Sequence, residues 1–553
     1  MKLITILFCL TLLISGALAA ETKLPPNRIN WSQMLPEDAN IILNGGDIQG
    51  QEFATEYDTI VYPNADFTDI YAVYGGNRTL IDSGTIGSAV NTRVIRAGVN
   101  ATPENGKMLI AGGPYSLEAD LNCTTGAPSY VNYYDVALPI TKNIYIEGLG
   151  RNATTLRLAP SQYSDTKRGL LIYIYCPYTV SGDGVGTAYT NLGLEHMTLD
   201  GDVGNQTPYY HDGAGVLLVG SVRGQARFND LEIKNSPNHG MYLGYNGGGW
   251  ERNSVVRDVY CHDNWGSSQI DNTENLVVDG FISENDSWGM WTASRKALVL
   301  DGMYGTSGHS IVSNVHIIDG SMFIFGYWKS RDDLSLRLSN LYIDSEDIGK
   351  HGIYIQHCNN VTISDGTIVA GTGNYAASVT NSTGITFDDL ELRGKRSLVV
   401  EAGYRSDVKV NGCDLNASED VFRIYGAGST ALFTGCDLNT SSAAAYLINV
   451  QAGAKASLIG CHGSDNGLIY VSSSSGVLEH SGTSGLGLEA YGATSVADGG
   501  TIAHGMKITP TYASADGTLA GTNAVVTAKD ATHLTIDLDG VTTTQIVNWE
   551  AKY

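Results

Sequence analysis

The chain has 553 residues and a formal net charge of -24 at pH 7. Such an acidic surface repels nucleic acid and anionic lipid, so neither is an expected partner. Eight cysteines are widely scattered, and only Cys9 precedes residue 20. The remaining odd, dispersed set does not indicate a disulfide scaffold.

The first twenty residues have the layout of a secretory signal peptide. Lys2 precedes an apolar run from Leu3 to Ile14, and Ala17-Leu18-Ala19-Ala20 supplies a small-residue end. The apolar run is short for a bilayer span, and the sequence has no second one. We therefore expect cleavage after about residue 20 and a secreted protein, extracellular or at the cell surface, without a membrane span in the mature chain. Eleven N-x-S/T sequons permit N-glycosylation.

A period of about two dozen residues dominates the rest of the chain. Three near-identical segments place Cys413, Cys436 and Cys461 at steps of 23 and 25 residues. The same frame continues backwards through a set of ladder positions. These are Leu390, Thr367, Leu341, Val315, Phe281, Val259, Leu231, Met197 and Ile144. Most follow Asn, Asp or Gly and precede a hydrophobe two residues later, which is the pattern of a turn feeding a short strand.

A coil of this length holds three short strands and cannot bury its own inner face. Stacking the coils pairs each strand with its copy one rung above and forms internal apolar ladders. The sequence therefore predicts an all-β parallel β-helix solenoid over residues 105–495. Leucine-rich and propeller repeats lack support because their signatures are absent from the sequence. The three cysteines are interpreted as small buried hydrophobes of one ladder.

Residues 105–157 carry a recognisable pattern, "GG-x-Y" followed by "I-x-G-x-G-R-x-A-T-x-L". It occupies Gly112, Gly113, Tyr115, Ile146, Gly148, Gly150, Arg151, Ala153, Thr154 and Leu156. This segment resembles the opening of pectate-lyase-superfamily β-helices, and the resemblance extends over roughly residues 70–490. It implies a right-handed helix, and it implies that residues 91–104, at the end of an N-terminal segment (21–104), form a short capping helix. The scaffold carries lyases, hydrolases, epimerases, tailspikes and non-enzymatic surface proteins, so the fold alone fixes little of the chemistry.

The pattern changes after about residue 496. Residues 496–553 read as four or five short strands separated by Gly and Asp turns. They resemble the small β-sandwich that tail-fibre and secreted β-helix proteins append. Such a domain could cap the stack, form a homotrimer or bind sugar. Capping is the simplest role, because an exposed last rung is an open sheet edge.

Tryptophans gather in the middle coils, where five of the seven lie between residues 250 and 328. Trp265 and Trp288 stand in the related corner segments "NWG" and "SWG". A cluster of exposed rings indicates an interaction site, and flat rings suit sugar faces. The predicted substrate-binding residues are Trp265, Trp288, Trp291, Trp328 and His262. Packing of these rings beneath long loops explains them equally well, and the corner histidines His239 and His351 are predicted to be structural.

Three aspartates form a predicted column. Asp263 and Asp286 align on the Trp-Gly corners, while Asp263 and Asp319 each follow a ladder position by four residues. Rungs are about 4.8 Å apart, so such carboxylates would lie roughly 5 or 10 Å apart. They could share a proton, serve as a glycosidase pair or bind Ca²⁺, the one cofactor that the pattern suggests. Turn capping by Asp is the simpler explanation.

The segment "YWKSRDD" supplies Arg331 and Asp332, which complete the predicted catalytic set of Asp263, Asp286, Asp319, Arg331 and Asp332. A lyase of this fold needs a basic residue to abstract a proton beside a uronate carboxylate. An exposed ion-pair cluster explains the same letters without catalysis. The signatures of polygalacturonases and pectate lyases are not recognisable, and the pattern assigns no particular residue to a metal.

These observations predict a secreted carbohydrate-active protein that binds a polysaccharide or surface glycan along an outer groove. Cleavage by lyase or glycoside hydrolase chemistry is the sharper form of this hypothesis. The alternative is a non-catalytic cell-surface structural protein or adhesin. A viral tailspike has the same architecture but fits poorly with a signal peptide.

Overall fold

The computed structural model describes residues 56–553 except for several short stretches. The stretches left out are 77–78, 126–131, 176–188, 210–213, 221–223, 246–250, 272, 290–295, 302–308, 327–334, 347–350, 372, 402–404, 443–445, 452, 464–467, 472–475, 487–488, 497–500, 504–511, 518–522, 530–532, 540–544 and 553. Within the described residues, no helix has the length and apolar character needed to cross a membrane. The predicted signal peptide at 1–20 lies outside this range and stays a prediction.

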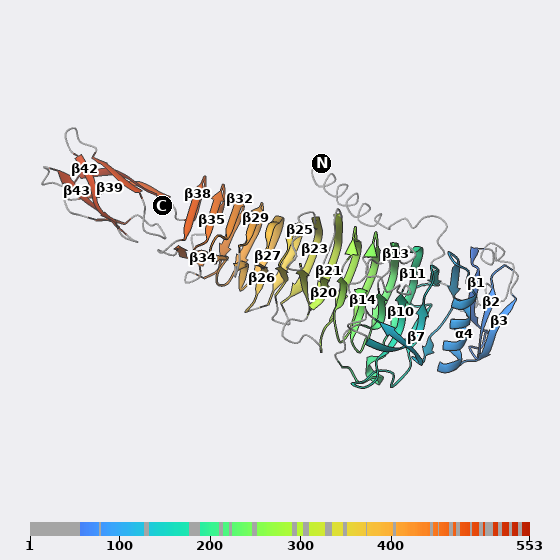
Figure 1. Ribbon diagram of the computed structural model, residues 1–553. Helices are drawn as coiled ribbons and strands as arrows, with labels where there is room; N and C mark the ends of the chain where they lie inside the picture. The colour runs from blue at the N-terminus through green and yellow to red at the C-terminus, as the bar shows by residue number, and fades with distance from the viewer. Residues whose placement is uncertain are drawn as a thin grey trace, which may run out of the picture. The chain divides into compact units, whose positions relative to one another are not determined.

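Two long sheets make up most of the described chain (Figure 1). Sheet B is the smaller, and apart from β6 its strands run parallel to their neighbours. Its strands are β6 (Leu121–Thr125), β7 (Asn132–Ile140), β10 (Gly169–Tyr175), β12 (Ala214–Gly220), β14 (His239–Tyr245), β17 (Ser268–Asp271), β20 (Lys296–Asp301), β22 (Ser321–Phe325), β24 (Ile353–Gln356), β26 (Tyr375–Thr380), β28 (Arg396–Glu401), β31 (Phe422–Ile424), β34 (Tyr446–Val450) and β37 (Leu468–Val471).

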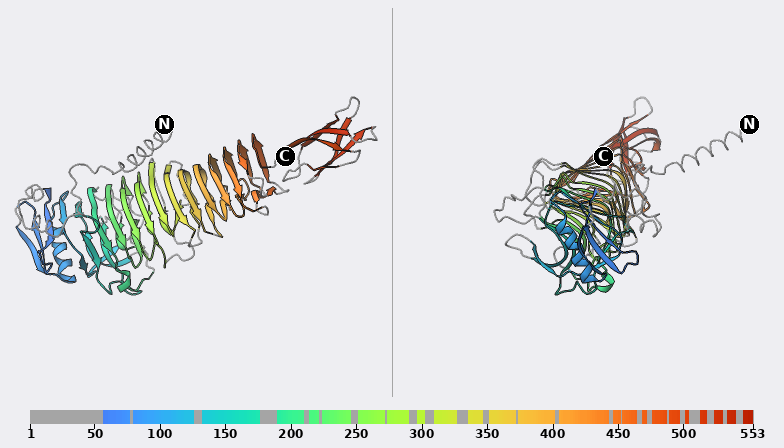
Figure 2. Two further views of the ribbon diagram at one scale, coloured as in Figure 1. Left: turned by 180° about the vertical axis from the view of Figure 1, so that it is seen from behind. Right: turned by 90° about the vertical axis from the view of Figure 1, so that its right-hand side faces the viewer.

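Sheet A contains two strand segments from each coil, joined by a bend. In many coils the two segments form one continuous strand. Its strands are β1 (Thr59–Pro63), β2 (Asp69–Tyr74), β3 (Leu80–Thr85), β4 (Lys107–Ile110), β5 (Tyr115–Leu117), β8 (Tyr145–Gly148), β9 (Thr155–Leu158), β11 (Tyr189–Asp200), β13 (Gly224–Lys234), β16 (Val255–His262), β19 (Val277–Glu284), β21 (His309–Ile318), β23 (Ser335–Ser345), β25 (Asn359–Ala370), β27 (Thr383–Gly394), β29 (Asp407–Asn411), β30 (Asp414–Ala417), β32 (Thr430–Thr434), β33 (Asp437–Thr440), β35 (Lys455–Ile459), β36 (His462–Gly463) and β38 (Val477–Ser481). From β11 onward they follow one another in chain order, as Figure 2 also shows from behind.

The predicted ladder is present in the register of sheet A. Met197 pairs with Leu231, Leu231 with Val259, and the series runs on to Leu341 without a break. The chain is therefore a right-handed parallel β-helix, as the sequence predicted. The three cysteines Cys413, Cys436 and Cys461 follow in adjacent coils and are all buried.

Two ladder positions were predicted wrongly. Leu341 pairs with Gly366, so Thr367 lies one residue beyond the ladder. Ile144 is not a ladder position either. Thr198 pairs with Thr155, so the residue on the neighbouring strand at the level of Met197 is Thr154. The step from Leu341 to Gly366 is one residue shorter than the prediction assumed, and alternation therefore turns Thr367 to the outer face beside Tyr342.

Sheet A bends once in each coil, at a residue with left-handed backbone conformation. From β11 to β38 these residues have φ between 50° and 76°. They form what we call the corner ladder: His196, Asp230, Asp258, Gly280, Asn314, Asn340, Asp365, Asp389, Gly412, Gly435, Gly460 and Gly482. Glycine adopts this conformation without penalty, and Asn and Asp tolerate it better than other residues. This preference explains why the sequence places Asn, Asp or Gly before most ladder positions; His196, before Met197, is the exception.

One apolar core fills the space between the two sheets, from Val61 to Leu486. Alternation along sheet A sends every second side chain inward, as in β16, where Val256, Val259 and Cys261 are fully buried. Burial of each such apolar side chain contributes roughly 1.5–3 kcal/mol. Outward side chains on the same strands are therefore free to carry function.

The N-terminal end of the stack has the predicted helical cap. Helix α4 (Ser88–Ala101) begins and ends three residues earlier than the expected span of 91–104. It buries Val94, Ile95 and Val99 against the first rung, and β1 pairs in parallel with β4 beside it. The apolar face of this helix thus covers core that would otherwise be open.

The last described strands leave the parallel pattern. They form two three-stranded antiparallel sheets. One contains β39 (Glu489–Val496), β44 (Gln545–Lys552) and β41 (Tyr512–Gly517), and the other β40 (Thr501–Ala503), β43 (His533–Asp539) and β42 (Asn523–Lys529). Their assembly into a sandwich, and a role for it in forming a homotrimer, stay predictions. Short elements on the coils are η2 (Val203–Asn205), β15 (Glu251–Arg252) and β18 (Thr273–Glu274).

Candidate functional site

Two of the predicted catalytic aspartates share one turn position at the end of sheet A strands. Asp263 follows β16 and Asp319 follows β21, both in left-handed conformation. Asn285 occupies the same position on the coil between them, and its Nδ2 donates to Asp263 Oδ1 at 2.8 Å. The two carboxyl-bearing residues are thus two rungs, roughly 10 Å, apart along the stack. This spacing is too long for a retaining glycosidase pair and lies at the upper end of the range for an inverting pair.

Asp286 does not join this column but points into the protein. It is fully buried, accepts hydrogen bonds from the main-chain N and Nδ2 of Asn264 at 3.1 and 2.9 Å, and accepts one from Ser283 Oγ at 2.6 Å. Burial raises its pKa to about 7, against the opposing effect of these hydrogen bonds. The predicted alignment of Asp263 with Asp286 is therefore wrong. The turn from Glu284 to Trp288 is one residue longer than that from His262 to Trp265, so the Trp-Gly pairs mislead the alignment.

His262 is held between two carboxylates on the outer face of β16. Its Nε2 lies 3.0 Å from Glu232 Oε1 and its Nδ1 lies 2.8 Å from Asp263 Oδ2. Burial acts to lower the pKa of His262, but the two carboxylates outweigh it and raise the pKa above its usual value. Burial likewise acts to raise the pKa of Glu232, yet hydrogen bonds from His262, Thr198 and Lys234 lower it to about 2. His262 is therefore paired with an ionised Glu232 and keeps its proton to a higher pH than a free histidine does.

Tyr260 extends this group by one more carboxylate. Its ring stacks on the His262 ring with centroids 4.5 Å apart, and its hydroxyl donates to Glu284 Oε2 at 2.7 Å. Burial and the Glu284 carboxylate raise the pKa of Tyr260. A hydroxyl, an imidazole and three carboxylates therefore lie together on β13, β16 and β19.

The two described tryptophans of the predicted binding set behave differently. Trp265 is half-buried, and Gly289 of the next coil packs so closely that an added Cβ there would lie 1.8 Å from Trp265 Nε1. Trp288 is 39% exposed and donates through Nε1 to the Asp263 carbonyl at 3.3 Å. Trp265 thus serves packing, whereas Trp288 offers an exposed ring beside Asp263.

The other predicted site residues lie outside the described part of the chain. These are Trp291, Trp328, Arg331 and Asp332, and their roles stay predictions.

The corner histidines fit a structural role. His239 is buried, its Nδ1 lies 2.9 Å from the Ser267 carbonyl, and burial lowers its pKa to about 4. His351 Nδ1 accepts a hydrogen bond from the main-chain N of Tyr375 at 3.2 Å.

A row of exposed apolar and aromatic side chains lies next to the His262 group. Tyr260, Ile282, His316 and Tyr342 occupy register-matched outward positions on four consecutive rungs. Ile282 is 39% and Tyr342 40% exposed, and the His316 and Tyr342 rings meet edge to face at 4.6 Å. We call these four residues the outer strip. The sequence offered one signal for it, because each member directly follows a ladder position.

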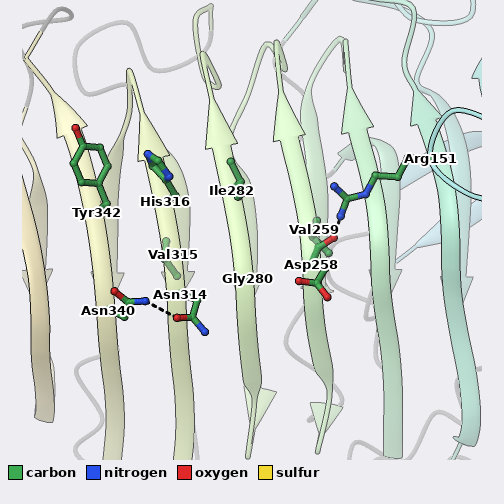
Figure 3. A pocket seen from close by; sticks show the side chains of 10 residues that line it. All are labelled: Arg151, Asp258, Val259, Gly280, Ile282, Asn314, Val315, His316, Asn340 and Tyr342. Carbon is green, nitrogen blue, oxygen red and sulfur yellow. Dashed lines mark hydrogen bonds between the residues drawn. The ribbon is translucent and has the colours of Figure 1, made fainter. Parts of the chain in front are cut away.

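A groove of about 380 Å³ runs between the outer strip and the corner ladder (Figure 3). Ile282, His316 and Tyr342 lie at one level on neighbouring strands, and the polar corner residues lie at another. Of these, Asn340 Nδ2 donates to Asn314 Oδ1 at 2.6 Å. The groove thus has an apolar wall and a wall of amide groups, which is the usual composition of a site for a polar ligand with apolar faces.

Arg151 marks one end of the groove. Its Nε lies 2.8 Å from Asp230 Oδ1, and a terminal nitrogen donates to the carbonyl of Asp258. Asp230 in turn lies 2.7 Å from Nδ1 of His196. The arginine therefore bridges different coils, and it places a cationic group at this end of the groove beside Asp230 and Asp258.

The described residues do not include a metal centre. No group of three or more His, Cys, Asp or Glu side chains in this part of the chain is arranged to hold an ion. The predicted Ca²⁺ site at the aspartate column thus has no matching ligand set among the described residues.

The comparisons with known proteins bear on the fold. No family model and no curated protein matches the sequence. Among solved structures, the chain is similar to the tailspike protein of E. coli bacteriophage HK620. In a variant bound to a hexasaccharide the identity is 8%, the TM-score 0.52, and the match covers 85% of this chain and 91% of the tailspike. The complex with a pentasaccharide gives a TM-score of 0.51 at the same identity and coverage.

A mannuronan C-5 epimerase A-module from Azotobacter vinelandii also matches, at 15% identity and a TM-score of 0.42, over 72% of this chain and 96% of the module. At such low identities the likeness to the tailspike concerns the fold and not the chemistry. Together with the stacked parallel sheets, it shows that the chain has the parallel β-helix fold.

Proposed function

We propose that this protein binds a polysaccharide along the outer face of sheet A, over β16, β19, β21 and β23. The observation that carries the proposal is the outer strip beside the groove. Its four rungs span about 15 Å along the stack, so it can contact several consecutive sugar units. The likeness to a tailspike solved with a hexasaccharide supports the choice of ligand class.

The side chains of the strip suit sugar rings better than they suit solvent. Exposed apolar surface costs free energy until a ligand covers it, and contiguous exposed rings mark interaction sites. Tyrosine has an apolar ring for the C–H faces of a sugar and a hydroxyl for its polar edge. Asn314 and Asn340 supply amide donors and acceptors on the opposite wall.

Cleavage is the finer part of the proposal, and His262 is its centre. The raised pKa leaves His262 protonated to a higher pH than a free histidine, so it is suited to act as general acid. Glu232 stays ionised and Asp263 orients the ring, while Trp288 and the predicted residues Trp291, Trp328, Arg331 and Asp332 would extend the site. Asp286 is too deeply buried to contact a substrate without movement.

The test is affinity electrophoresis of the mature chain in gels that contain neutral or acidic polysaccharides. We expect retardation by at least one polymer and a loss of about tenfold in affinity for Tyr342→Ala, because truncation of a central aromatic contact costs more than about 1 kcal/mol. Tyr74→Ala, which removes a 45% exposed tyrosine from β2, is the matched control and should bind as the parent does.

Cleavage is measured in the same reactions by reducing ends and by ultraviolet absorbance of unsaturated uronates. His262→Gln should abolish product release while leaving retardation intact. Binding without release of product would support the non-catalytic alternative, an adhesin that binds glycans. Retardation by no polymer, or equal retardation of the Tyr342→Ala and parent proteins, would remove the proposal.

A further inference from the structure

A second cavity lies on the other sheet. It has a volume of about 710 Å³ and opens on the outer face of sheet B at strands β28, β31, β34 and β37. Three of its lining residues form one outward column, since Arg423 pairs with Asn449 and Asn449 with Tyr470 on successive rungs. None of its lining residues belongs to the outer strip or to the groove on sheet A.

The charges in this cavity neutralise one another. Arg396 lies 3.2 Å from Asp420 and 3.4 Å from Glu419, and Arg423 lies 3.9 Å from Asp420. With its amide turned so that the oxygen faces Arg423, Gln451 accepts from that guanidinium at 3.0 and 3.3 Å. Two guanidinium groups thus face two carboxylates. An anionic ligand would have to displace the Asp420 carboxylate from the two arginines, and Asp420 is only 6% exposed. A neutral ligand can form hydrogen bonds with the guanidinium groups and with the carboxylates.

One buried acceptor in the cavity wall has no partner among the described residues. Asn449 is 5% exposed, and its Oδ1 makes no hydrogen bond with any described residue. Leaving a buried acceptor unsatisfied costs about 1–3 kcal/mol. A ligand hydroxyl that donates to this oxygen would recover that cost, so the site favours a ligand rich in hydroxyl groups.

Two tyrosines form the apolar wall. The Tyr446 and Tyr470 rings meet edge to face with centroids 5.9 Å apart, and Tyr470 is 44% exposed. Ring faces, a buried acceptor and balanced charges are together the groups that a sugar needs, since it has apolar C–H faces and many hydroxyls.

We propose that this cavity is a second carbohydrate site, and that it binds a short segment of a neutral oligosaccharide. Tyr470 stacks against one sugar ring, Asn449 accepts a hydroxyl proton, and the Arg–carboxylate pairs bond to further hydroxyls. This inference goes beyond the groove on sheet A and does not depend on it, because the two sites lie on different sheets and share no residue.

Calorimetric titration of the mature chain tests the proposal, with cellohexaose, mannohexaose, xylohexaose and the hexamer of N-acetylglucosamine as neutral probes. Hexagalacturonate is the anionic probe. We expect at least one neutral probe to bind with an affinity that is insensitive to salt, since no net charge is exchanged. Tyr470→Ala should weaken that binding about tenfold or more, and Tyr470→Phe, which keeps the ring, should not.

Two further variants distinguish binding in this cavity from binding in the groove on sheet A. Asn449→Leu removes the unsatisfied acceptor, so it should unfold no earlier than the parent and still lose affinity for the neutral probe. Tyr342→Ala, on sheet A, should leave this binding unchanged. The proposal is overturned if no neutral probe binds, if only hexagalacturonate binds, or if Tyr342→Ala abolishes binding that Tyr470→Ala leaves intact.

Discussion

The corner ladder has two regions with one backbone conformation and different side chains. On the middle coils it carries His, Asp and Asn, interrupted by Gly280, whereas from Gly412 to Gly482 every member is glycine. The groove on sheet A follows the first region, where Asn314 Nδ2 also donates to Asp279 Oδ1 at 2.6 Å. The same bend therefore serves as plain scaffold in one region and as a polar wall in the other.

This difference shows in which coils the protein keeps a strained, left-handed backbone conformation at a residue other than glycine. A residue other than glycine in left-handed conformation costs roughly 1–2 kcal/mol, less for Asn and Asp. Glycine would satisfy the bend at every coil, yet eight consecutive coils from His196 to Asp389 contain seven residues with side chains at this point. Strained positions that persist beside a groove are a recognised mark of a functional surface.

The largest expected effect tests whether the two regions share one scaffold. Phe281 of the middle coils and Phe433 of the glycine region are both fully buried. Truncation of either to alanine should lower the free energy of unfolding by about 3–5 kcal/mol, because it leaves a cavity in close-packed core. Urea unfolding measures both. A cost for Phe433→Ala far below that for Phe281→Ala would show that the glycine region is loosely packed.

A second, smaller effect depends on pH and is confined, within the middle coils, to those that carry His262 and Asp286. The folded-state pKa of Asp286 is about 7 against an ordinary value of 3.8, so the folded state binds a proton that the unfolded state releases. Its stabilising contribution is complete below about pH 4 and is lost as the pH rises to about 7. His262 acts in the same direction, since its raised pKa contributes stability that is lost as the pH rises through that value.

Hydrogen exchange of peptides from β16 and β19 measures this loss, with peptides from β25 and β27 as an internal reference. Exchange in β16 and β19 should accelerate by about tenfold or more between about pH 5 and pH 8, beyond the intrinsic rate. Asp286→Asn should remove most of the acceleration, because the amide stays neutral and its oxygen still accepts from Asn264. An unchanged pH dependence in that variant would contradict the assignment.

The smallest effect sharpens the corner comparison itself. A side chain added at Gly435 would meet nothing within 4 Å, so only its φ of 60° matters. Gly435→Ala should lose about 1–2 kcal/mol of stability, and Gly435→Asn about 1 kcal/mol less, because asparagine tolerates the left-handed region. Thermal unfolding of the two variants gives the difference. Equal losses would show that the side chains of the middle coils do not relieve strain.

Prediction from the sequence succeeded where the signal repeats. The ladder from Met197 to Leu341 and the turn residue before most of its positions follow from local preferences that recur in each coil, whereas the helix α4 was expected only from the resemblance to other β-helices. The site was harder to predict. Asp263 was placed correctly at an outer turn, but a turn one residue longer directs Asp286 inward. The outer strip escaped notice because Tyr, Ile, His and Tyr share no residue type.

The sequence by itself determined the parallel β-helix and the order of its coils, because apolar periodicity and turn chemistry are properties of neighbouring residues. Only the tertiary structure decided which outward side chains meet. Contacts such as that of Arg151 with Asp230, or the column of Arg423, Asn449 and Tyr470, join different coils. Their register depends on the length of every turn between them, and a single inserted residue moves a side chain to the opposite face of its sheet.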